Sequence, residues 1–346
     1  MFDLSYYDGT KLLSMKDING NTPEIFICVT NRSFGKTTYF ARLLINRYFA
    51  KGKKFCLLYR FNYELDECAD KFFKNIKELF FENCTMTAKK RAKGIYYELF
   101  LNDKSCGYAT TLNQADNIKK YSHLLSDTET MFMDEFQSEN NKYVSNEVQK
   151  LISIHTSLAR GGGKQVKYLP IYMCSNSVSL INPYFTALGI STRLNDKTKF
   201  LKGDGYVVEQ GFGEEVSKLQ KDSAFNRAFA NESYVSYASQ NIYLNDNATF
   251  IENVEGKNEY FCTLHYKGKN YGIRCYPEQG VIYVNEKADL KFPRRFSVTT
   301  DDHNVNYVMI RRNTFYIDQM RYYFDHGCLR FKNLQCKEAF LTSISY

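Results

Sequence analysis

Short apolar runs alternate with stretches of helical periodicity between residue 20 and about residue 210. The runs are bounded by turn-forming residues and predict strands at 25–29, 55–59, 130–133, 166–174 and 206–209. Between them, apolar residues recur at three- and four-residue spacing and predict helices at 36–49, 65–81 and 146–160, the last with Ser145 as its N-cap. Continuous apolar strands are typical of parallel sheets buried on both faces, so we expect an α/β domain. The run 95–101, followed by Asn102 and Asp103, predicts an inserted hairpin.

A polar stretch at 211–240 separates this region from a shorter one that is rich in strands. The stretch contains Ala-rich helical pieces and predicts a lid or linker. Beyond it, strands are predicted within 259–276, 280–285 and 295–300, and a helix at 315–324. We therefore expect an α/β domain at 1–210, a lid or linker at 211–240 and a smaller α+β domain at 241–346.

Composition agrees with a two-domain globular protein of 346 residues, of which 44% are hydrophobic. The net charge of +8 permits a polyanionic partner without requiring one. No apolar run approaches the roughly 18 residues that a membrane helix needs, and the first ten residues lack the pattern of a secretion signal. The 10 cysteines form no C-x-x-C pair, which favours reduced thiols in a cytoplasmic protein.

The first predicted strand leads through a short loop into the helix that begins near Lys36. Gly35, Lys36 and Thr37 form the end of a G-x-x-x-x-G-K-[ST] phosphate-binding loop (P-loop), in which backbone N–H groups and the lysine hold phosphates and the hydroxyl ligates Mg²⁺. Thr30 stands where the pattern has glycine, and because a β-branched residue resists positive φ, we expect a different path into the loop. An ordinary strand-to-helix turn with a lysine at the helix start is the alternative. The expected nucleotide-binding residues here are Thr30, Asn31, Arg32, Ser33, Phe34, Gly35, Lys36, Thr37 and Thr38.

A second motif supports the nucleotide site. The apolar run at 130–133 ends in Asp134 and Glu135, which is the form of a Walker B element. Asp134 would hold the Mg²⁺ and Glu135 would act as general base on the attacking water, so the pair indicates hydrolysis of ATP rather than binding alone.

Three further groups have both a functional and a structural interpretation. Asn176 follows a predicted strand, where it could contact the γ-phosphate or cap a turn. Arg160 precedes a Gly-rich loop and could be an arginine finger for a neighbouring subunit, although the end of a helix attracts cations in any case. A basic run next to the predicted hairpin is expected on a protruding loop, where it could bind DNA phosphates or simply be a solvated surface; its residues are Lys89, Lys90, Arg91 and Lys93.

Taken together, these motifs resemble the DNA-packaging ATPases of small short-tailed phages, the phi29-like group. The likeness spans nearly the whole chain. It includes the segment S-N-S-V-S-L-I-N-P-Y-F at 175–185, the T-T-D-D segment at 299–302 with Asn304 and Asn306, and Gly327 with residues 329–331.

This resemblance implies a P-loop ATPase domain of the additional-strand, catalytic-glutamate class, a helical linker and a C-terminal domain similar to an RNase H-like nuclease that has lost its catalytic acids. It implies that Lys36, Thr37, Asp134 and Glu135 bind ATP and Mg²⁺, that Arg32 is a P-loop arginine, and that Arg160 acts in trans.

The resemblance further implies a homomeric ring, five-membered in the family, that drives double-stranded DNA through the phage portal into a capsid in the host cytoplasm. A structural RNA is a further partner in some relatives. Two alternatives remain open at this point: a terminase-like enzyme that also cleaves DNA, and a nucleotide-gated scaffold without translocation.

Overall fold

The chain divides into two compact units, residues 1–245 and 246–346, in a computed structural model. The structure describes residues 7–140, 142–160, 165–180, 182–190, 193–194, 198–214, 217–218, 222–228 and 250–344. The last part of the predicted lid or linker, residues 229–240, lies outside the described residues. Within the described residues, no helix has the length and apolar character needed to span a membrane.

The first unit is built on a sheet with the strand order β3-β4-β5-β2-β6-β7-β1-β9-β8. The central strands β5, β2, β6, β7, β1 and β9 are parallel, whereas β3, β4 and β8 are antiparallel additions at the two edges. The strands are β1 (Ile25–Thr30), β2 (Lys54–Tyr59), β3 (Met86–Arg91), β4 (Tyr96–Leu101), β5 (Lys104–Thr111), β6 (Thr128–Met133), β7 (Ile171–Asn176), β8 (Phe200–Gly203) and β9 (Tyr206–Gln210). The predicted α/β domain with a parallel sheet is confirmed.

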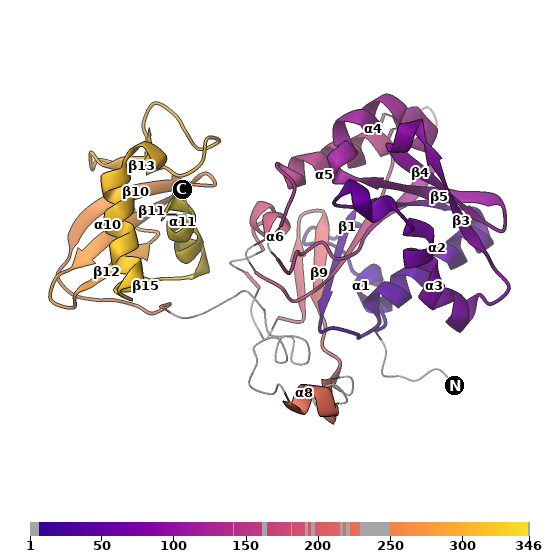
Figure 1. Cartoon of the computed structure of the whole chain (residues 1–346), viewed down its shortest axis with the longest axis horizontal. Coiled ribbons are helices and arrows are strands. Elements are labelled where there is room, and N and C mark those ends of the chain that lie inside the picture. Colours follow the sequence, from indigo (N-terminus) through magenta and orange to yellow (C-terminus); the bar gives the residue numbers. More distant parts are fainter. Residues whose placement is uncertain are drawn as a thin grey trace. The chain divides into compact units, whose positions relative to one another are not determined.

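Helices cover both faces of this sheet (Figure 1). One face carries α1 (Thr10–Ser14), α2 (Lys36–Lys51) and α3 (Cys68–Phe80); the other carries α4 (Ala115–Tyr121), α5 (Glu147–Leu158) and α6 (Pro183–Ala187). Successive side chains of β1 alternate between the two cores, with Phe26 and Cys28 on the α2 side and Ile27 and Val29 on the α5 side. Both sets must be apolar, which explains the unbroken apolar run of this strand. The short α8 (Ala224–Ala228) and four 3-10 turns, η1 (Asn62–Leu65), η2 (Ala92–Gly94), η3 (Leu112–Gln114) and η4 (Ser122–Leu125), complete the unit's described elements.

Three local predictions differ from the structure. The predicted strand at 166–174 begins only at Ile171, because Pro170 has no N–H to pair with a neighbouring strand. The N-cap of α5 is Asn146, in a left-handed conformation, and not Ser145. The basic run does not lie on a protruding loop: its first part is β3, the edge strand that pairs with β4. The hairpin itself is confirmed, since Asn102 and Asp103 both have positive φ between β4 and β5.

The second unit contains a sheet with the strand order β14-β13-β10-β11-β12-β15. The β10-β11-β12 part is antiparallel, while β13 runs parallel to β10, β14 parallel to β13 and β15 parallel to β12. Two helices cover one face, where Met320 and Phe340 pack among strand residues such as Leu264 and Ile273. The elements are β10 (Glu259–Tyr266), β11 (Lys269–Tyr276), β12 (Val281–Asn285), β13 (Arg295–Ser297), β14 (Val308–Met309), η5 (Ile310–Arg312), α10 (Thr314–Asp325), β15 (Leu329–Phe331) and α11 (Leu334–Ile344).

Candidate functional site

The two sequence motifs meet at the carboxyl edge of the parallel sheet. β7 lies between β1 and β6, and all three strands run in the same direction. The residues that follow these strands therefore emerge at one edge, where Thr30 at the end of β1 is the register partner of Asn176 at the end of β7. Such an edge is where open α/β sheets bind ligands.

Thr30 fits this arrangement without strain. It is the last residue of β1, fully buried, and its φ is not positive. The left-handed residues of the loop are Ser33, with φ 62°, and Gly35, with φ 94°. Thr30 thus has a strand conformation, in which β-branched residues are favoured, and does not need positive φ, while the expected different path into the loop stays a prediction.

Lys36 opens α2 and points toward the neighbouring strand. Its side chain is 6% exposed, and its Nζ donates to Asn176 Oδ1 at 2.7 Å. Gly35 is the N-cap of α2 and has no side chain with which to cap the first-turn N–H groups. These groups and the positive end of the helix dipole are available for an anion such as a phosphate.

Asp134 directly follows β6 and contacts the P-loop helix. Its carboxylate accepts a hydrogen bond from the Glu135 N–H at 3.0 Å, and the nearby Thr37 hydroxyl favours its charged form and so lowers its pKa. Burial raises the pKa of Asp134, and the nearby Lys36 charge opposes this only in part. A hydroxyl and a half-buried carboxylate are oxygen ligands of the kind that Mg²⁺ takes, so Thr37 and Asp134 fit the ion.

Glu135 sits in a strained backbone conformation next to Asp134. Its φ is 51°, in the left-handed region that non-glycine residues seldom adopt. Although Glu135 is exposed, partial loss of contact with water raises the pKa of its carboxyl, and the Asp134 and Glu139 carboxylates raise it further, whereas Arg32 and Lys36 lower it. A raised pKa suits a carboxylate that must take up a proton, because it brings the group nearer to neutral pH.

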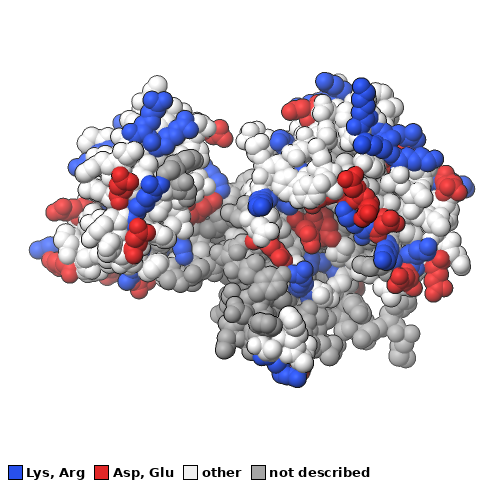
Figure 2. All heavy atoms as spheres, in the orientation of Figure 1, with Lys and Arg blue, Asp and Glu red and all other residues white. Residues whose placement is uncertain are grey.

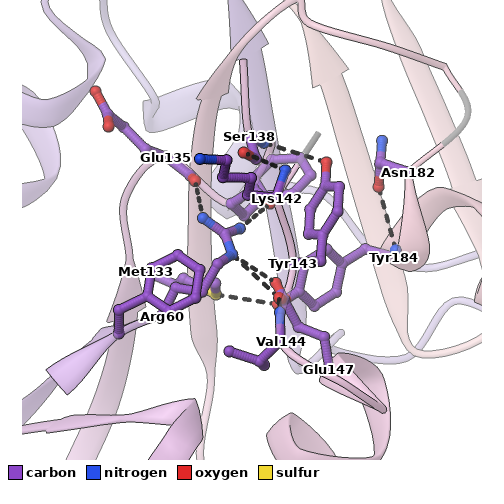
Figure 3. A network of polar contacts seen from close by, with 12 residues as sticks. Arg60, Met133, Glu135, Ser138, Lys142, Tyr143, Val144, Glu147, Asn182 and Tyr184 are labelled. Carbon is purple, nitrogen blue, oxygen red and sulfur yellow. Dashed lines mark hydrogen bonds and ion pairs between the residues drawn. The ribbon is translucent and has the colours of Figure 1, made fainter. Parts of the chain in front are cut away.

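A buried polar network fixes the backbone behind Glu135 (Figure 3). Arg60, which directly follows β2, donates from Nη2 to the Phe136 carbonyl at 2.7 Å and from Nη1 to the Glu135 carbonyl at 3.4 Å. Its Nε donates to both carboxylate oxygens of Glu147, at 3.0 and 3.1 Å. Tyr184 donates its hydroxyl to Glu147 at 2.7 Å. The Glu135 side chain extends away from this network, so Arg60 fixes the main chain and leaves the carboxylate open to substrate.

Comparisons with known proteins agree with this architecture. The model of the podovirus DNA encapsidation protein (Gp16) family matches residues 1–343. The chain belongs to this family.

Among its relatives are the DNA packaging proteins of Bacillus phages phi29 and PZA, each 24% identical over 332 residues that cover 95% of this chain and 93% of the relative. The fold is similar to a chain of the bacteriophage phi29 genome packaging motor assembly, with a TM-score of 0.70, 22% identity, and coverage of 98% of this chain and 99% of that chain. A phi28 gp11 DNA packaging motor chain gives a TM-score of 0.64 at 18% identity, with 99% of both chains covered.

Arg160, which the family resemblance marks as a trans-acting residue, lies away from the P-loop of its own subunit. It follows the C-terminal end of α5, is exposed, and lies in a surface hollow with Glu24, which precedes β1. A helix of 12 residues is about 18 Å long, so Arg160 is at the opposite end of α5 from Glu147 and the Arg60 network. The structure therefore brings together Lys36, Thr37, Asp134, Glu135 and Asn176, but not Arg160.

The basic run lies on the exposed edge of the first unit's sheet. Arg91 pairs with Glu98 at 2.7 Å and Lys89 lies over the Phe100 ring, whereas Lys90 and Lys93 are exposed on the same edge. Arginine and lysine side chains gather where Figure 1 draws α4 and the start of β4 (Figure 2). Tyr96 of β4 contacts Tyr121 of α4, so Lys119 and Lys120 of α4 extend this basic surface.

Sequence reasoning missed Arg60, Glu147 and Tyr184. Each has an ordinary structural interpretation in sequence, and they become one cluster only in the folded chain. Two signals were available: Tyr184 belongs to the 175–185 segment that carries the family resemblance, and Arg60 is a charged residue directly after a buried strand of the parallel set.

Proposed function

We propose that this DNA encapsidation protein is an ATPase of the additional-strand, catalytic-glutamate class. The observation that carries the proposal is the convergence of Lys36, Thr37, Asp134 and Glu135 at one sheet edge. The position of β7 between β1 and β6 supports the subclass, because that strand is the one that separates the P-loop strand from the acidic strand.

Each residue would have a defined task. The P-loop N–H groups and Lys36 bind the phosphates of ATP, and Thr37 and Asp134 hold Mg²⁺, which neutralises charge that develops on the phosphates. Glu135 takes a proton from the attacking water at its carboxylate oxygen. Asn176, which already accepts from Lys36, is placed to contact the terminal phosphate. Arg32, near Glu139 at 3.4 Å, is a second P-loop cation.

We further propose that hydrolysis drives double-stranded DNA through the portal into the capsid, in a homomeric ring. The family and the packaging motors to which the fold is similar support this function. The position of Arg160 supports active sites between subunits, because this residue is exposed and lies at the opposite end of α5 from the Arg60 network. By family resemblance the ring has five members and works in the host cytoplasm, with a structural RNA in some relatives. Lys89, Lys90, Arg91 and Lys93 are the proposed contacts to the DNA backbone.

For the second unit we propose an RNase H-like docking domain without nuclease activity. Its strand order, three antiparallel strands flanked by parallel β13 and β14, supports the RNase H-like assignment. On the central strand β10, the positions paired with β13 are occupied by Thr263, Leu264 and His265, none of which is an acid. In the described part of the chain, no group of three or more His, Cys, Asp or Glu is arranged to hold a metal ion.

The decisive experiment replaces Glu135 with Gln and measures ATP hydrolysis with and without double-stranded DNA. Loss of the general base should lower kcat about 10²- to 10⁴-fold while the variant still binds ATP. Glu129→Gln is a matched control, since Glu129 lies on the same strand β6 but pairs with Lys53 on the surface. Hydrolysis at the wild-type rate by Glu135→Gln would refute the proposed mechanism.

Mixed rings test the shared active site. Arg160→Ala and Lys36→Ala subunits should each be inactive alone, and mixing them should restore part of the activity, because some interfaces then hold an intact Lys36 facing an intact Arg160. If intact mixed rings recover no activity, Arg160 does not act in trans.

A further inference from the structure

The P-loop is packed against the segment that follows β9, at Gly211 and Gly213. The Gly211 N–H donates to the Val29 carbonyl at 2.8 Å, and the Gly213 N–H donates to Asn31 Oδ1 at 3.1 Å. Asn31 is 1% exposed, and its Nδ2 has no partner among the described residues. The segment therefore holds the P-loop through its main chain and through a buried side chain.

Both glycines are needed for this close approach. A Cβ at Gly213 would lie 2.4 Å from the Phe34 ring, and one at Gly211 would lie 3.0 Å from the Thr30 methyl group. Neither glycine has a positive φ, so the reason for glycine here is space rather than backbone conformation. On its other side, Phe34 is held by Tyr7, whose N–H donates to the Phe34 carbonyl at 2.8 Å and whose ring packs edge-on against the Phe34 ring.

We propose that Phe34 and Gly213 are positioning residues through which ATP binding at the P-loop and the position of the 211–214 segment are coupled. The inference rests on the proposed nucleotide site. Phe34 directly precedes Gly35, so the P-loop cannot change path at its tip without moving the ring that fills the space above Gly213. A displacement of the segment moves the same ring, and by thermodynamic reciprocity each event biases the other. In sequence, this contact lies in the part of the first unit that leads toward the second unit.

Substitution at the two glycines gives a graded test. In Gly213→Ala the added methyl group displaces the Phe34 ring and with it the P-loop. Part of the binding free energy of ATP is then spent on returning the P-loop to its binding conformation, so the affinity for ATP should fall roughly tenfold. Gly211→Ala, with the longer contact, should weaken binding less. Adding Phe34→Leu to Gly213→Ala removes the ring that the methyl group meets, so the double variant should bind ATP more tightly than Gly213→Ala alone. Affinity is compared with the melting temperature of each variant, because a merely structural defect would change stability without a matching change in the affinity of the folded protein.

The measurements are the dissociation constant of a non-hydrolysable ATP analogue and the melting temperature of the full chain. The proposal is overturned if Gly213→Ala binds the analogue as the wild type does, or if Phe34→Leu fails to improve binding of a folded Gly213→Ala variant. Failure of the wild type to bind the analogue would instead refute the proposed nucleotide site.

Hydrogen exchange of the unmodified protein tests the same coupling without a substitution. Residues 211–214 should exchange more slowly with the analogue bound, because the Gly213 N–H bond to Asn31 is then reinforced. Unchanged exchange there, with slowed exchange at residues 30–38, would show that the segment does not sense the nucleotide.

Discussion

Glu147→Gln should destabilise the first unit more than any surface substitution in it. Glu147 is 3% exposed and accepts from Arg60, from the Tyr184 hydroxyl and from the Val144 N–H, the last at 2.9 Å. Burial raises the pKa of Tyr184 well above its ordinary value, and the Glu147 charge raises it further, so Tyr184 stays a hydrogen-bond donor to the carboxylate. The Glu147 carboxylate thus balances the positive charge of Arg60, a residue that is only 7% exposed.

The magnitude follows from which group is left without its partner. Neutralising Glu147 leaves the Arg60 cation buried without a counter-charge, which costs about 3–5 kcal/mol. Tyr184→Phe removes one hydrogen bond to a charged acceptor and should cost about 1.5–3 kcal/mol. The exposed Lys119–Asp116 pair gives the scale for a surface interaction, about 0–1 kcal/mol.

Urea unfolding followed by circular dichroism and tyrosine fluorescence measures these differences, since the chain has 28 Tyr and no Trp. Arg60, Glu147 and Tyr184 all lie in the first unit, so the unfolding transition of the second unit serves as an internal reference. Arg60→Met combined with Glu147→Gln should be less destabilised than the sum of the two single variants, because no unpaired charge remains. A destabilisation below about 1 kcal/mol for Glu147→Gln, comparable with Asp116→Asn, would refute the reasoning.

Two further predictions concern chemistry and DNA. The Glu139 carboxylate raises the pKa of Glu135, whose deprotonated form is the active base. Glu139→Gln should therefore move the acid limb of the kcat–pH profile to lower pH, while the control Glu129→Gln leaves it in place. A shift of the limb to higher pH would contradict the assignment of Glu135 as the base. Replacing Lys90 and Lys93 with Ala should weaken DNA binding and reduce the slope of log K against log salt by roughly 0.9 for each DNA phosphate that the variant no longer neutralises. Lys51 and Lys53, exposed at the C-terminal end of α2 and just after it, are the matched control, and equal effects of the two pairs would exclude a specific role for the β3 edge.

The parts of the site that lie next to one another in sequence could be predicted, because their geometry is set locally. A buried strand that leads into Gly35-Lys36-Thr37, and another that ends in Asp134-Glu135, each fix where the chemistry emerges from the sheet. The meeting of Asn176 with Lys36 was also accessible, since it requires only that two parallel strands be neighbours.

Contacts that depend on distant packing could not be predicted in this way. Arg60 and Glu147 are 87 positions apart, and nothing in either local sequence specifies the other. The basic run next to the predicted hairpin was expected on a loop, and its Lys89–Arg91 part gives no strand signal, because it faces solvent on an edge strand and lacks an apolar alternation. For Thr30, the motif led us to expect a different path into the loop, whereas the conformation of the residue itself depends on β1, which supplies a φ that suits a β-branched side chain.

Residues outside the two motifs hold the loops that carry them. Substitutions at these residues should therefore affect ATP hydrolysis differently from substitutions within the motifs. Arg60 fixes the carbonyls behind Glu135, and Gly213 fixes the loop ahead of Lys36, yet neither is placed to touch a reacting atom. Loss of Glu135 removes a proton acceptor and must act on kcat whatever the ATP concentration, whereas a defect in the Gly213 contact acts on the fraction of P-loops ready for ATP and is overcome by more of it. Rates of hydrolysis measured at saturating and at limiting ATP therefore distinguish catalytic residues, such as Glu135, from positioning residues, such as Gly213.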